Sequence, residues 1–288
     1  MIQLADKVFV ETTYPGVNVG AVVTRKGTVC IDTPSFPRDA RHWAMRLHQV
    51  QPHALLFLLL TDYHGDRILN TRWLNAPIVV QNFTEQRLNS YEKRYPQALL
   101  DSLVARNPEC GRELLNSPVE QPALSFAQDM TIGNGRQRMV LLHRPGPTRG
   151  TVWVHLPELG ILFTSDSVVV DEQPPLAQAD SQQWLDSLAQ LQKDERFAGV
   201  QTIVPGRGSI CDKSAIEPVV RYISDMRTVV RDHWQQELPR EALSRHVAEF
   251  MSYFPTAPWP REWLVRQTRL SLEHLYDEIK WEQPAHIL

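Results

Sequence analysis

Cysteine is scarce in this chain, and its few cysteines are far apart. Cys30, Cys110 and Cys211 are odd in number and form no Cys-x-x-Cys pair. A disulfide framework needs paired cysteines and a thiolate zinc site needs closely spaced ones, so the sequence argues against both. We expect the three thiols to be small buried side chains instead.

Long apolar runs and a strong charge of either sign are also missing. The longest apolar run, residues 54–60, is far shorter than the roughly 20 residues that span a bilayer. The N-terminal sequence Met-Ile-Gln-Leu-Ala-Asp-Lys lacks the basic start and apolar stretch of a secretory signal. With 30 Lys and Arg residues against 33 Asp and Glu residues, the net charge of −3 does not attract polyanions. The sequence therefore predicts a cytoplasmic protein with no membrane and no nucleic-acid partner.

The residues that are present are typical of a globular α/β protein. A chain of 288 residues with 42% hydrophobic and 22% charged residues can bury a large core. Residues 17–23 and 28–32 are rich in β-branched side chains and predict a hairpin, and a helix over 38–50 follows. Residues 54–60 are continuously apolar, which predicts an interior strand covered on both faces.

The second half of the chain repeats this order of strands before a helix. The helix is predicted over 181–191, with Asp180 as its N-cap.

Residues 84–106 are polar and helical in character, are broken by Pro96, and are expected to lie on the outside. Further strands are expected over 77–80, 130–132, 138–143, 151–155, 161–166 and 202–204. This order predicts two sheets stacked between helices.

The residues from 213 onward have apolar side chains at helical spacing. We expect a domain over residues 1–211 and a helical C-terminal extension over 212–288 packed on it. The aromatic residues of the extension are expected to cover one flank of the domain or to line a subunit contact, which would make a homodimer. They are Trp234, Tyr253, Phe254, Trp259, Trp263 and Tyr276.

Four segments place polar side chains where predicted strands end. Thr61-Asp62-Tyr63-His64-Gly65-Asp66-Arg67 directly follows the buried strand, where α/β folds usually place their functional groups. The other three are Pro145-Gly146-Pro147-Thr148-Arg149-Gly150, Leu162-Phe163-Thr164-Ser165-Asp166 and Val204-Pro205-Gly206-Arg207-Gly208.

The order, spacing and strand context of these segments resemble the metallo-β-lactamase superfamily. That family has Thr-His-x-His-x-Asp-His after a buried strand, a Pro-Gly-His-Thr-x-Gly loop, a Gly-Asp after an apolar strand and a late Pro-Gly-His. The resemblance covers residues 17–211. It implies an αββα sandwich, in which two mixed sheets lie between helices, with a C-terminal helical appendage.

The resemblance also implies a two-metal hydrolase site, in which metal-bound water is the nucleophile. Matched position by position, three ligands of that site are retained in this chain: His64, Asp66 and Asp166. At four other positions the family has histidine and this chain does not: Asp62, Arg67, Pro147 and Arg207. Most of the ligand set implied by the family has therefore changed.

Both arginine replacements fall on ligands of the second metal. A guanidinium is not deprotonated in proteins and cannot bind a metal. A divalent cation about 4 Å from one guanidinium would meet a repulsion of about 8 kcal/mol at an effective dielectric near 20. We therefore expect no second metal, and expect Arg67 and Arg207 to form ion pairs with Asp66 and Asp166 instead.

A single divalent metal remains an alternative, held by Asp62, His64 and Asp166. This set suits Mn²⁺, Fe²⁺ or Mg²⁺ better than a structural Zn²⁺. Pro147 removes a further ligand, so we expect no metal cofactor. His64 is equally compatible with a hydrogen-bonded core histidine, Asp62 with a carboxylate that caps its loop, and Thr148 with a residue that preserves loop geometry.

Three further residues, His143, Arg144 and Arg149, flank the altered loop. Together with Arg67 and Arg207 they would make the mouth of the site basic and suited to a small anion. The alternative is that Arg144 and Arg149 are solvated loop residues.

Two functions follow from these patterns. The first is an inactive or non-classical hydrolase homologue that binds a small, anionic ligand in the inherited pocket. The second is a functioning hydrolase of an ester, thioester or similar compound, with one metal or with acid–base chemistry by His64. The catalytic candidates are His64, Asp66 and Asp166. The pocket and ion-pair candidates are Arg67, Arg207, Asp62, Tyr63 and Thr148.

Overall fold

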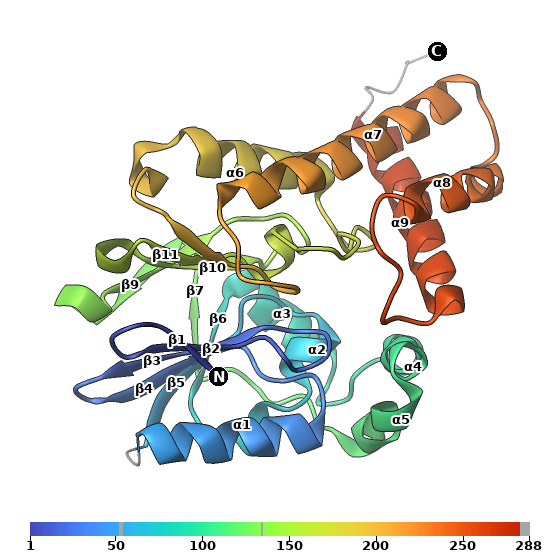
Figure 1. The fold of residues 1–288 in the computed structure, drawn as a ribbon. Coiled ribbons are helices and arrows are strands. Elements are labelled where there is room, and N and C mark those ends of the chain that lie inside the picture. Colours follow the sequence, from blue (N-terminus) through green and yellow to red (C-terminus); the bar gives the residue numbers. More distant parts are fainter. Residues whose placement is uncertain (52–53, 134, 283–288) are drawn as a thin grey trace.

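The computed structural model describes residues 1–51, 54–133 and 135–282. Two sheets stack face to face, and helices cover the outer face of each (Figure 1). This arrangement confirms the predicted αββα sandwich with helices at the C-terminal end.

The first sheet runs in the order β1-β2-β3-β4-β5-β6-β7. Its strands are β1 (Ile2–Ala5), β2 (Val8–Glu11), β3 (Val19–Thr24), β4 (Gly27–Ile31), β5 (Leu55–Leu59), β6 (Ile78–Gln81) and β7 (Leu124–Phe126). β1 to β4 pair antiparallel and β4 to β7 pair parallel. The predicted β3–β4 hairpin and the interior strand β5 are present. The sequence did not predict β1, β2 or β7, which are short strands toward the two edges of the sheet.

The second sheet runs in the order β12-β11-β10-β9-β8. Its strands are β8 (Asp129–Ile132), β9 (Met139–His143), β10 (Val152–Leu156), β11 (Ile161–Phe163) and β12 (Thr202–Val204). The pairs from β8 to β11 are antiparallel, whereas β11 and β12 are parallel. All of these strands were expected from the sequence.

The helices form the two outer layers and one flank (Figure 1). Helix α1 (Pro37–Val50) covers the first sheet, and α6 (Ser181–Lys193) and α7 (Ile216–Gln235) cover the second. Asp180 caps α6, as predicted, by accepting a hydrogen bond from the Gln183 backbone N–H at 3.0 Å. The remaining α-helices are α2 (Gly65–Ile68), α3 (Asn82–Ser90), α4 (Gln97–Arg106), α5 (Pro108–Gly111), α8 (Val247–Met251) and α9 (Arg261–Glu282).

Three apolar clusters fill the spaces between these layers. Trp43 and Leu47 of α1 pack with Leu58 on the outer face of the first sheet. Between the sheets, Val22 and Phe163 belong to the central cluster. Gly20 makes room there, because a Cβ atom at this position would lie 2.4 Å from the Phe163 ring.

The third cluster joins the second sheet to α6 and α7 and continues into the C-terminal helices. Trp184 of α6, Met226 of α7 and Leu272 of α9 all belong to it. One apolar cluster therefore extends across residue 211, and the division into residues 1–211 and 212–288 stays a prediction.

The segment 84–106 corrects one expectation. It forms α3 and α4 as predicted, but Arg106 at the end of α4 is buried, and so are Leu88 and Leu100. The segment is therefore not simply an outer excursion, because its last residue reaches the interior.

The structure also tests two expectations from composition, the absence of disulfides and the absence of a membrane-spanning helix. All three cysteines are free; Cys30 is fully buried, and Cys110 and Cys211 are partly buried. Within the described residues, no helix combines the length and the apolar character that a membrane crossing requires. The cytoplasmic location and the homodimer remain expectations.

Trp184 offers a test of the packing of α6 on the second sheet. Its side chain is fully buried, and its indole N–H donates to the Ser167 carbonyl at 3.0 Å. We expect Trp184→Ala to lower the free energy of unfolding by about 3–5 kcal/mol in urea denaturation, because a large cavity and an unpaired carbonyl remain. Trp281→Ala is the matched control, since Trp281 is 86% exposed, and should change stability by less than about 0.5 kcal/mol. Equal losses in the two variants would contradict this packing.

Candidate functional site

The polar segments predicted from the sequence meet where parallel strands end. β4 and β5 are parallel, so Asp32 and Thr61 leave the first sheet at the same edge. The Asp32 carboxylate accepts hydrogen bonds from the Thr61 backbone N–H at 2.8 Å and from its hydroxyl at 2.6 Å. These two bonds hold the loop that carries Asp62 and His64.

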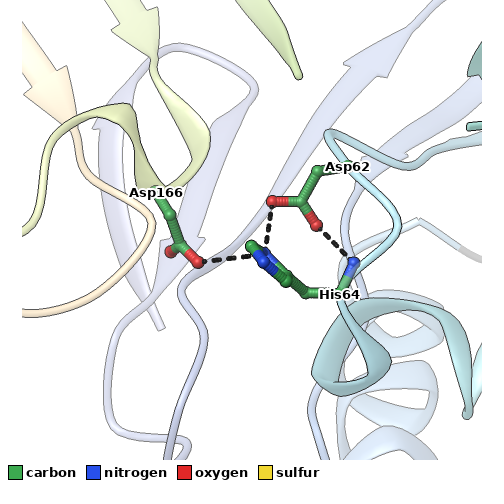
Figure 2. Close-up of side chains that lie close together, drawn as sticks. All are labelled: Asp62, His64 and Asp166. Atoms are coloured by element: carbon green, nitrogen blue, oxygen red, sulfur yellow. Dashed lines mark hydrogen bonds and ion pairs between the residues drawn. The ribbon is translucent and has the colours of Figure 1, made fainter. Parts of the chain in front are cut away.

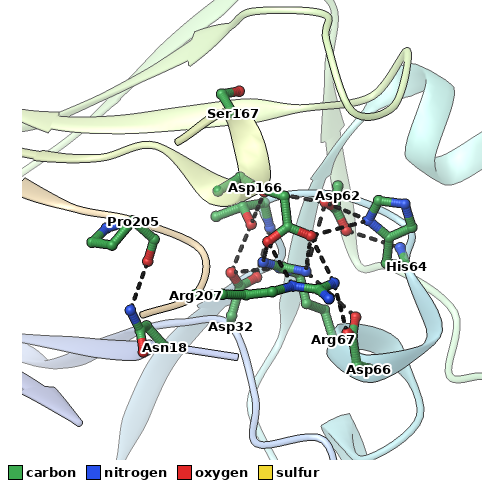
Figure 3. Close-up of polar contacts among 12 residues, drawn as sticks. Asn18, Asp32, Asp62, His64, Asp66, Arg67, Asp166, Ser167, Pro205 and Arg207 are labelled. Carbon is green, nitrogen blue, oxygen red and sulfur yellow. Dashed lines mark hydrogen bonds and ion pairs between the residues drawn. The ribbon is translucent and has the colours of Figure 1, made fainter. Parts of the chain in front are cut away.

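The second sheet supplies the facing residues in the same way. β11 and β12 are parallel, and their ends carry Asp166 and Arg207. The loop that carries Asp166 and the loop that carries Arg207 are in close contact at Gly206. A Cβ atom at this position would lie 2.2 Å from Asp166 Oδ1. Asn18 ties the loop of Arg207 to the first sheet, because its Nδ2 donates to the Pro205 carbonyl at 2.9 Å (Figure 3). Only glycine fits at position 206 without moving this carboxylate.

Arg67 of α2 lies at the centre of the site with a fully buried side chain (Figure 3). Its Nη2 donates to Asp166 Oδ1 at 2.6 Å and its Nη1 to Asp166 Oδ2 at 3.0 Å. Its Nε donates to Asp32 Oδ2 at 3.1 Å, and its Nη1 lies 3.4 Å from Asp66 and 3.8 Å from Asp62. One guanidinium therefore contacts four carboxylates.

Arg207 completes the contacts of Asp166 from the other side. Its Nε donates to Asp166 Oδ1 at 3.1 Å and its Nη2 to Asp166 Oδ2 at 2.9 Å. The same Nη2 donates to Asp66 Oδ2 at 2.9 Å. The ion pairs expected from the sequence between Arg67, Arg207 and the two carboxylates are thus present, and each oxygen of Asp166 faces two guanidiniums.

Arg106 is a member of the site that the sequence did not reveal. Its Nη1 donates to Asp66 Oδ2 at 2.8 Å, and its guanidinium carbon lies 4.1 Å from the ring centroid of Trp259. Its Nε and Nη2 are buried without a hydrogen-bond partner in the described part of the chain. No local motif marks Arg106, because its partner lies 40 residues earlier in the sequence.

His64 lies between two carboxylates (Figure 2). Its Nδ1 is 3.0 Å from Asp62 Oδ2 and 3.5 Å from Asp166 Oδ2. The other oxygen of Asp62 accepts from the His64 backbone N–H at 2.8 Å, and the Ser165 hydroxyl donates to Asp62 Oδ2 at 3.1 Å. Asp62 therefore both caps its loop and orients the imidazole.

Burial and charge set the protonation of these groups. Burial lowers the pKa of His64, but the Asp62 carboxylate and the hydrogen bonds to Asp62 and Asp166 outweigh this effect and raise it to about 9. Burial raises the pKa of Asp62, yet Arg67 and His64 bring it down to about 2. Both oxygens of Asp62 therefore accept hydrogen bonds as a carboxylate at neutral pH, and the imidazole is an imidazolium.

The other carboxyl groups are shifted by the arginines. Burial acts against ionisation of Asp66 and Asp166, but Arg207 and Arg67 hold the pKa of both below the ordinary range. Burial raises the pKa of Asp32 to about 6, since Arg67 offsets the desolvation only in part. All of these carboxyl groups are therefore mainly ionised at neutral pH.

We call these residues the ionic cluster, and its charges balance at pH 7. The positive groups are Arg67, Arg106, Arg207 and the His64 imidazolium. The negative groups are Asp32, Asp62, Asp66 and Asp166. Four positive charges against four negative charges leave no net charge in the buried cluster.

The ligand chemistry of the cluster does not fit a pair of metal ions. Asp62, His64 and Asp166 each offer a ligand atom, and these atoms lie within 4.8 Å of one another (Figure 2). However, both oxygens of Asp166 already accept from two guanidiniums, and the Nδ1 of His64 faces carboxylates rather than an open position. A metal would bind here only after a buried guanidinium had moved, so these residues as arranged do not fit one.

Two further candidates from the sequence lie away from the ionic cluster. Thr148 is buried in its loop, where its backbone N–H donates to the Thr151 hydroxyl at 3.1 Å, as expected of a residue that maintains loop geometry. Tyr63 points to a separate surface hollow that it shares with Arg149. Neither residue is among the described residues that line the cavity beside the cluster.

The basic mouth expected from the sequence does not form. Arg144 lies 3.8 Å from Asp129, and the His143 ring contacts the Arg149 carbonyl at 2.8 Å. Arg149 lines the separate hollow with Tyr63, while Arg67 and Arg207 are neutralised by carboxylates. Arg144 and Arg149 therefore do not belong to the site.

A cavity of about 120 Å³ opens beside the ionic cluster. Residues 65–66, 172–175 and 177–178 form part of its wall, and α4 forms another part with Leu99 and Leu103. The C-terminal segment closes it with Trp259, Trp263 and α9. Two aromatic residues of this segment that were expected to be packing, Trp259 and Trp263, thus also line the cavity.

The balance of charges predicts a large effect when one central cation is removed. Arg67→Met keeps much of the side-chain volume but leaves Asp32 without a counter-charge and removes one of the two guanidiniums that neutralise Asp166. We expect the free energy of unfolding to fall by about 3–5 kcal/mol in urea denaturation. Arg138→Met is the control, because its ion pair with Glu158 is on the surface and should contribute about 0–1 kcal/mol. A small effect of Arg67→Met would contradict the assigned charge network.

The raised pKa of His64 predicts a pH-dependent stability. Because the folded pKa is about 9 and the ordinary value is 6.5, the stabilisation is complete below pH 6.5 and is lost as the pH rises through 9. This change amounts to about 3 kcal/mol. Urea denaturation between pH 6 and 10 should show the loss in the native protein and not in His64→Gln. Parallel curves for the two proteins would show that His64 is not a buried cation.

Comparison with known proteins agrees with the fold. The sequence profile of the family described as "Metallo-beta-lactamase superfamily" matches residues 13–199. A search of curated proteins finds no match. Among solved structures, a metallo-beta-lactamase family protein from Thermus thermophilus is similar, with a TM-score of 0.66 and 18% identity over 96% of this chain and 95% of that one.

Two other solved structures match the sandwich and cover less of this chain. A metallo-beta-lactamase from Pontibacter korlensis has a TM-score of 0.60 and 21% identity over 78% of this chain and 98% of its own. DIM-1 metallo-beta-lactamase exposed to ceftazidime has a TM-score of 0.61 and 20% identity over 78% and 95%. At these identities the structures show a shared fold, and the family profile covers more than half of the sequence. The chain therefore belongs to the metallo-beta-lactamase superfamily.

Proposed function

We propose that this protein is a non-classical member of its superfamily, in which guanidiniums replace the paired metal ions. In this proposal the protein is an inactive hydrolase homologue, a pseudoenzyme, that binds a small molecule in the cavity beside the ionic cluster. The proposal also includes a homodimer and a cytoplasmic location, both of which are expected from the sequence.

The observation that carries this proposal is the state of Asp166. A carboxylate that bridges two metals needs lone pairs directed at both ions. Here Arg67 and Arg207 donate to both oxygens of Asp166 at 2.6–3.1 Å. The positive charge that metal ions would supply here comes from guanidiniums. A guanidinium neither coordinates a water molecule as a metal ion does nor loses its proton.

The protonation of the cluster also argues against hydrolysis by acid–base chemistry. A general base needs a free lone pair and a pKa near the working pH. The Nδ1 of His64 faces two carboxylates, and its pKa of about 9 keeps the imidazole protonated. Asp62 and Asp166 have pKa values below the ordinary range and are poor proton donors at neutral pH.

One observation favours a second function. The ligand atoms of Asp62, His64 and Asp166 lie within 4.8 Å of one another. If the guanidiniums moved, these residues would make an oxygen-rich site for a single Mn²⁺, Fe²⁺, Mg²⁺ or Zn²⁺. The protein would then be a hydrolase of an ester, thioester or similar substrate.

Metal analysis distinguishes the two functions. We expect the native protein, purified without chelator, to contain far less than one equivalent of divalent metal per chain by plasma mass spectrometry. Added Mn²⁺ or Zn²⁺ should produce no hydrolysis of p-nitrophenyl acetate or of an acyl thioester above the uncatalysed rate. Stoichiometric metal together with metal-dependent hydrolysis would establish the second function and reject the first.

A variant with the family's ligands provides the positive control. We expect the combined changes Asp62→His, Arg67→His, Pro147→His and Arg207→His to create zinc binding that the native protein lacks. Circular dichroism would show whether the variant is folded. Equal zinc binding by the native protein and this variant would contradict the view that arginines exclude the metal.

A further inference from the structure

The cavity beside the ionic cluster has apolar walls and a polar floor. Leu99 and Leu103 of α4 line it together with Trp259 and Trp263 of the C-terminal segment. The rings of the two tryptophans lie 6.1 Å apart and are tilted by 54°. These walls are suited to a flat apolar group, since aromatic faces and leucine side chains stabilise it by burial and stacking.

Three polar side chains that line the cavity have donor hydrogens with no acceptor among the described residues. His64 and Arg207 both line the cavity, with side chains that are 13% and 8% exposed. Within the described residues, no acceptor contacts His64 Nε2 or Arg207 Nη1. Ser102 accepts bonds from Trp263 at 3.2 Å and Gln267 at 3.1 Å, which leaves its hydroxyl hydrogen free to donate.

The Asp66 carboxylate, which lines the cavity beside His64 and Arg207, has both of its oxygens occupied. Both oxygens of Asp66 accept from arginines, with Oδ2 bonded to Arg106 at 2.8 Å and to Arg207 at 2.9 Å. A ligand that reaches His64 and Arg207 therefore meets free donors, and it should present an acceptor oxygen to them.

The charges around the cavity do not favour an anion. The ionic cluster sums to zero with His64 protonated and to one negative charge with His64 neutral. Glu172 lines the same cavity and accepts from the Trp259 indole N–H at 3.2 Å, so it adds a further negative charge. The whole ionic cluster and Glu172 therefore sum to one negative charge, so the surroundings as a whole do not compensate an anionic ligand for its lost hydration.

We propose that the cavity binds an uncharged molecule that joins a carbonyl oxygen to a flat apolar group. The oxygen accepts hydrogen bonds on the side of His64 and Arg207, and the apolar group lies among Leu103, Trp259 and Trp263. This inference rests on the proposed function and deepens it, because it names the class of ligand. It also replaces the anionic ligand expected from the sequence.

The test compares two probes of the same shape and different charge. Benzamide carries a neutral carbonyl group and benzoate an ionised carboxylate at pH 7.5, and both have one flat ring. In isothermal titration calorimetry of the full chain, we expect the dissociation constant of benzamide to be at least tenfold lower than that of benzoate.

Variants of the cavity wall locate the binding. Trp263→Ala should weaken benzamide binding at least fivefold, because it removes one face of the cavity. The matched control is Trp281→Ala on the same helix, which lies outside the cavity at 86% exposure and should bind benzamide as the native protein does. If Trp263→Ala does not fold, Leu99→Trp provides a second variant, since its larger side chain fills the cavity and should abolish binding.

The outcomes separate this inference from the proposed function. Benzoate binding equal to or tighter than benzamide, with the same dependence on Trp263, would overturn the uncharged ligand and leave the small-molecule pocket in place. Benzamide binding that neither Trp263→Ala nor Leu99→Trp affects would place it elsewhere and also overturn the inference. If neither probe binds, both the inference and the proposed ligand pocket fail, whereas the metal analysis still decides whether the protein is a hydrolase.

Discussion

The buried guanidinium of Arg67 is the interaction on which the rest of the site depends. It contacts carboxylates from the ends of β4 and β11, which belong to different sheets. Four carboxylates gathered at this edge would repel one another strongly in a buried setting without a cation between them. The ion pairs of Arg67 and Arg207 therefore stabilise the junction of the two sheets as well as the site itself.

The same charge balance limits the chemistry that the site supports. A metal site activates water because the ion has an open position and the nearby base has a free lone pair. In this protein the donors of three arginines and one imidazolium are directed at the carboxylates. The result is a neutral cluster, and in the proposed function its free donors at the cavity recognise an acceptor of the ligand and activate no nucleophile.

The C-terminal segment forms one wall of the cavity beside the ionic cluster. Trp259 packs against the guanidinium of Arg106, and Trp263 donates to Ser102 of α4 at 3.2 Å. The C-terminal segment thus contacts α4, and the two together enclose the cavity. Since one apolar cluster joins α6, α7 and α9, this wall is built on the core of the sandwich rather than on a loose appendage.

The sequence by itself determined the sandwich, the strand ends that carry the site, and the pairing of Arg67 and Arg207 with carboxylates. The strand ends follow from the apolar runs and the polar segments after them, whereas the sandwich and the pairing follow from the family resemblance, which places both arginines at metal-ligand positions. Only the tertiary structure decided that Arg106, Asp32 and Trp259 join the site, and that Arg144 and Arg149 do not. The contacts of Arg106 and Trp259 link residues that are far apart in the chain and carry no local pattern. The strands β1, β2 and β7 were not predicted, because segments of three or four residues are too short to show a clear alternation.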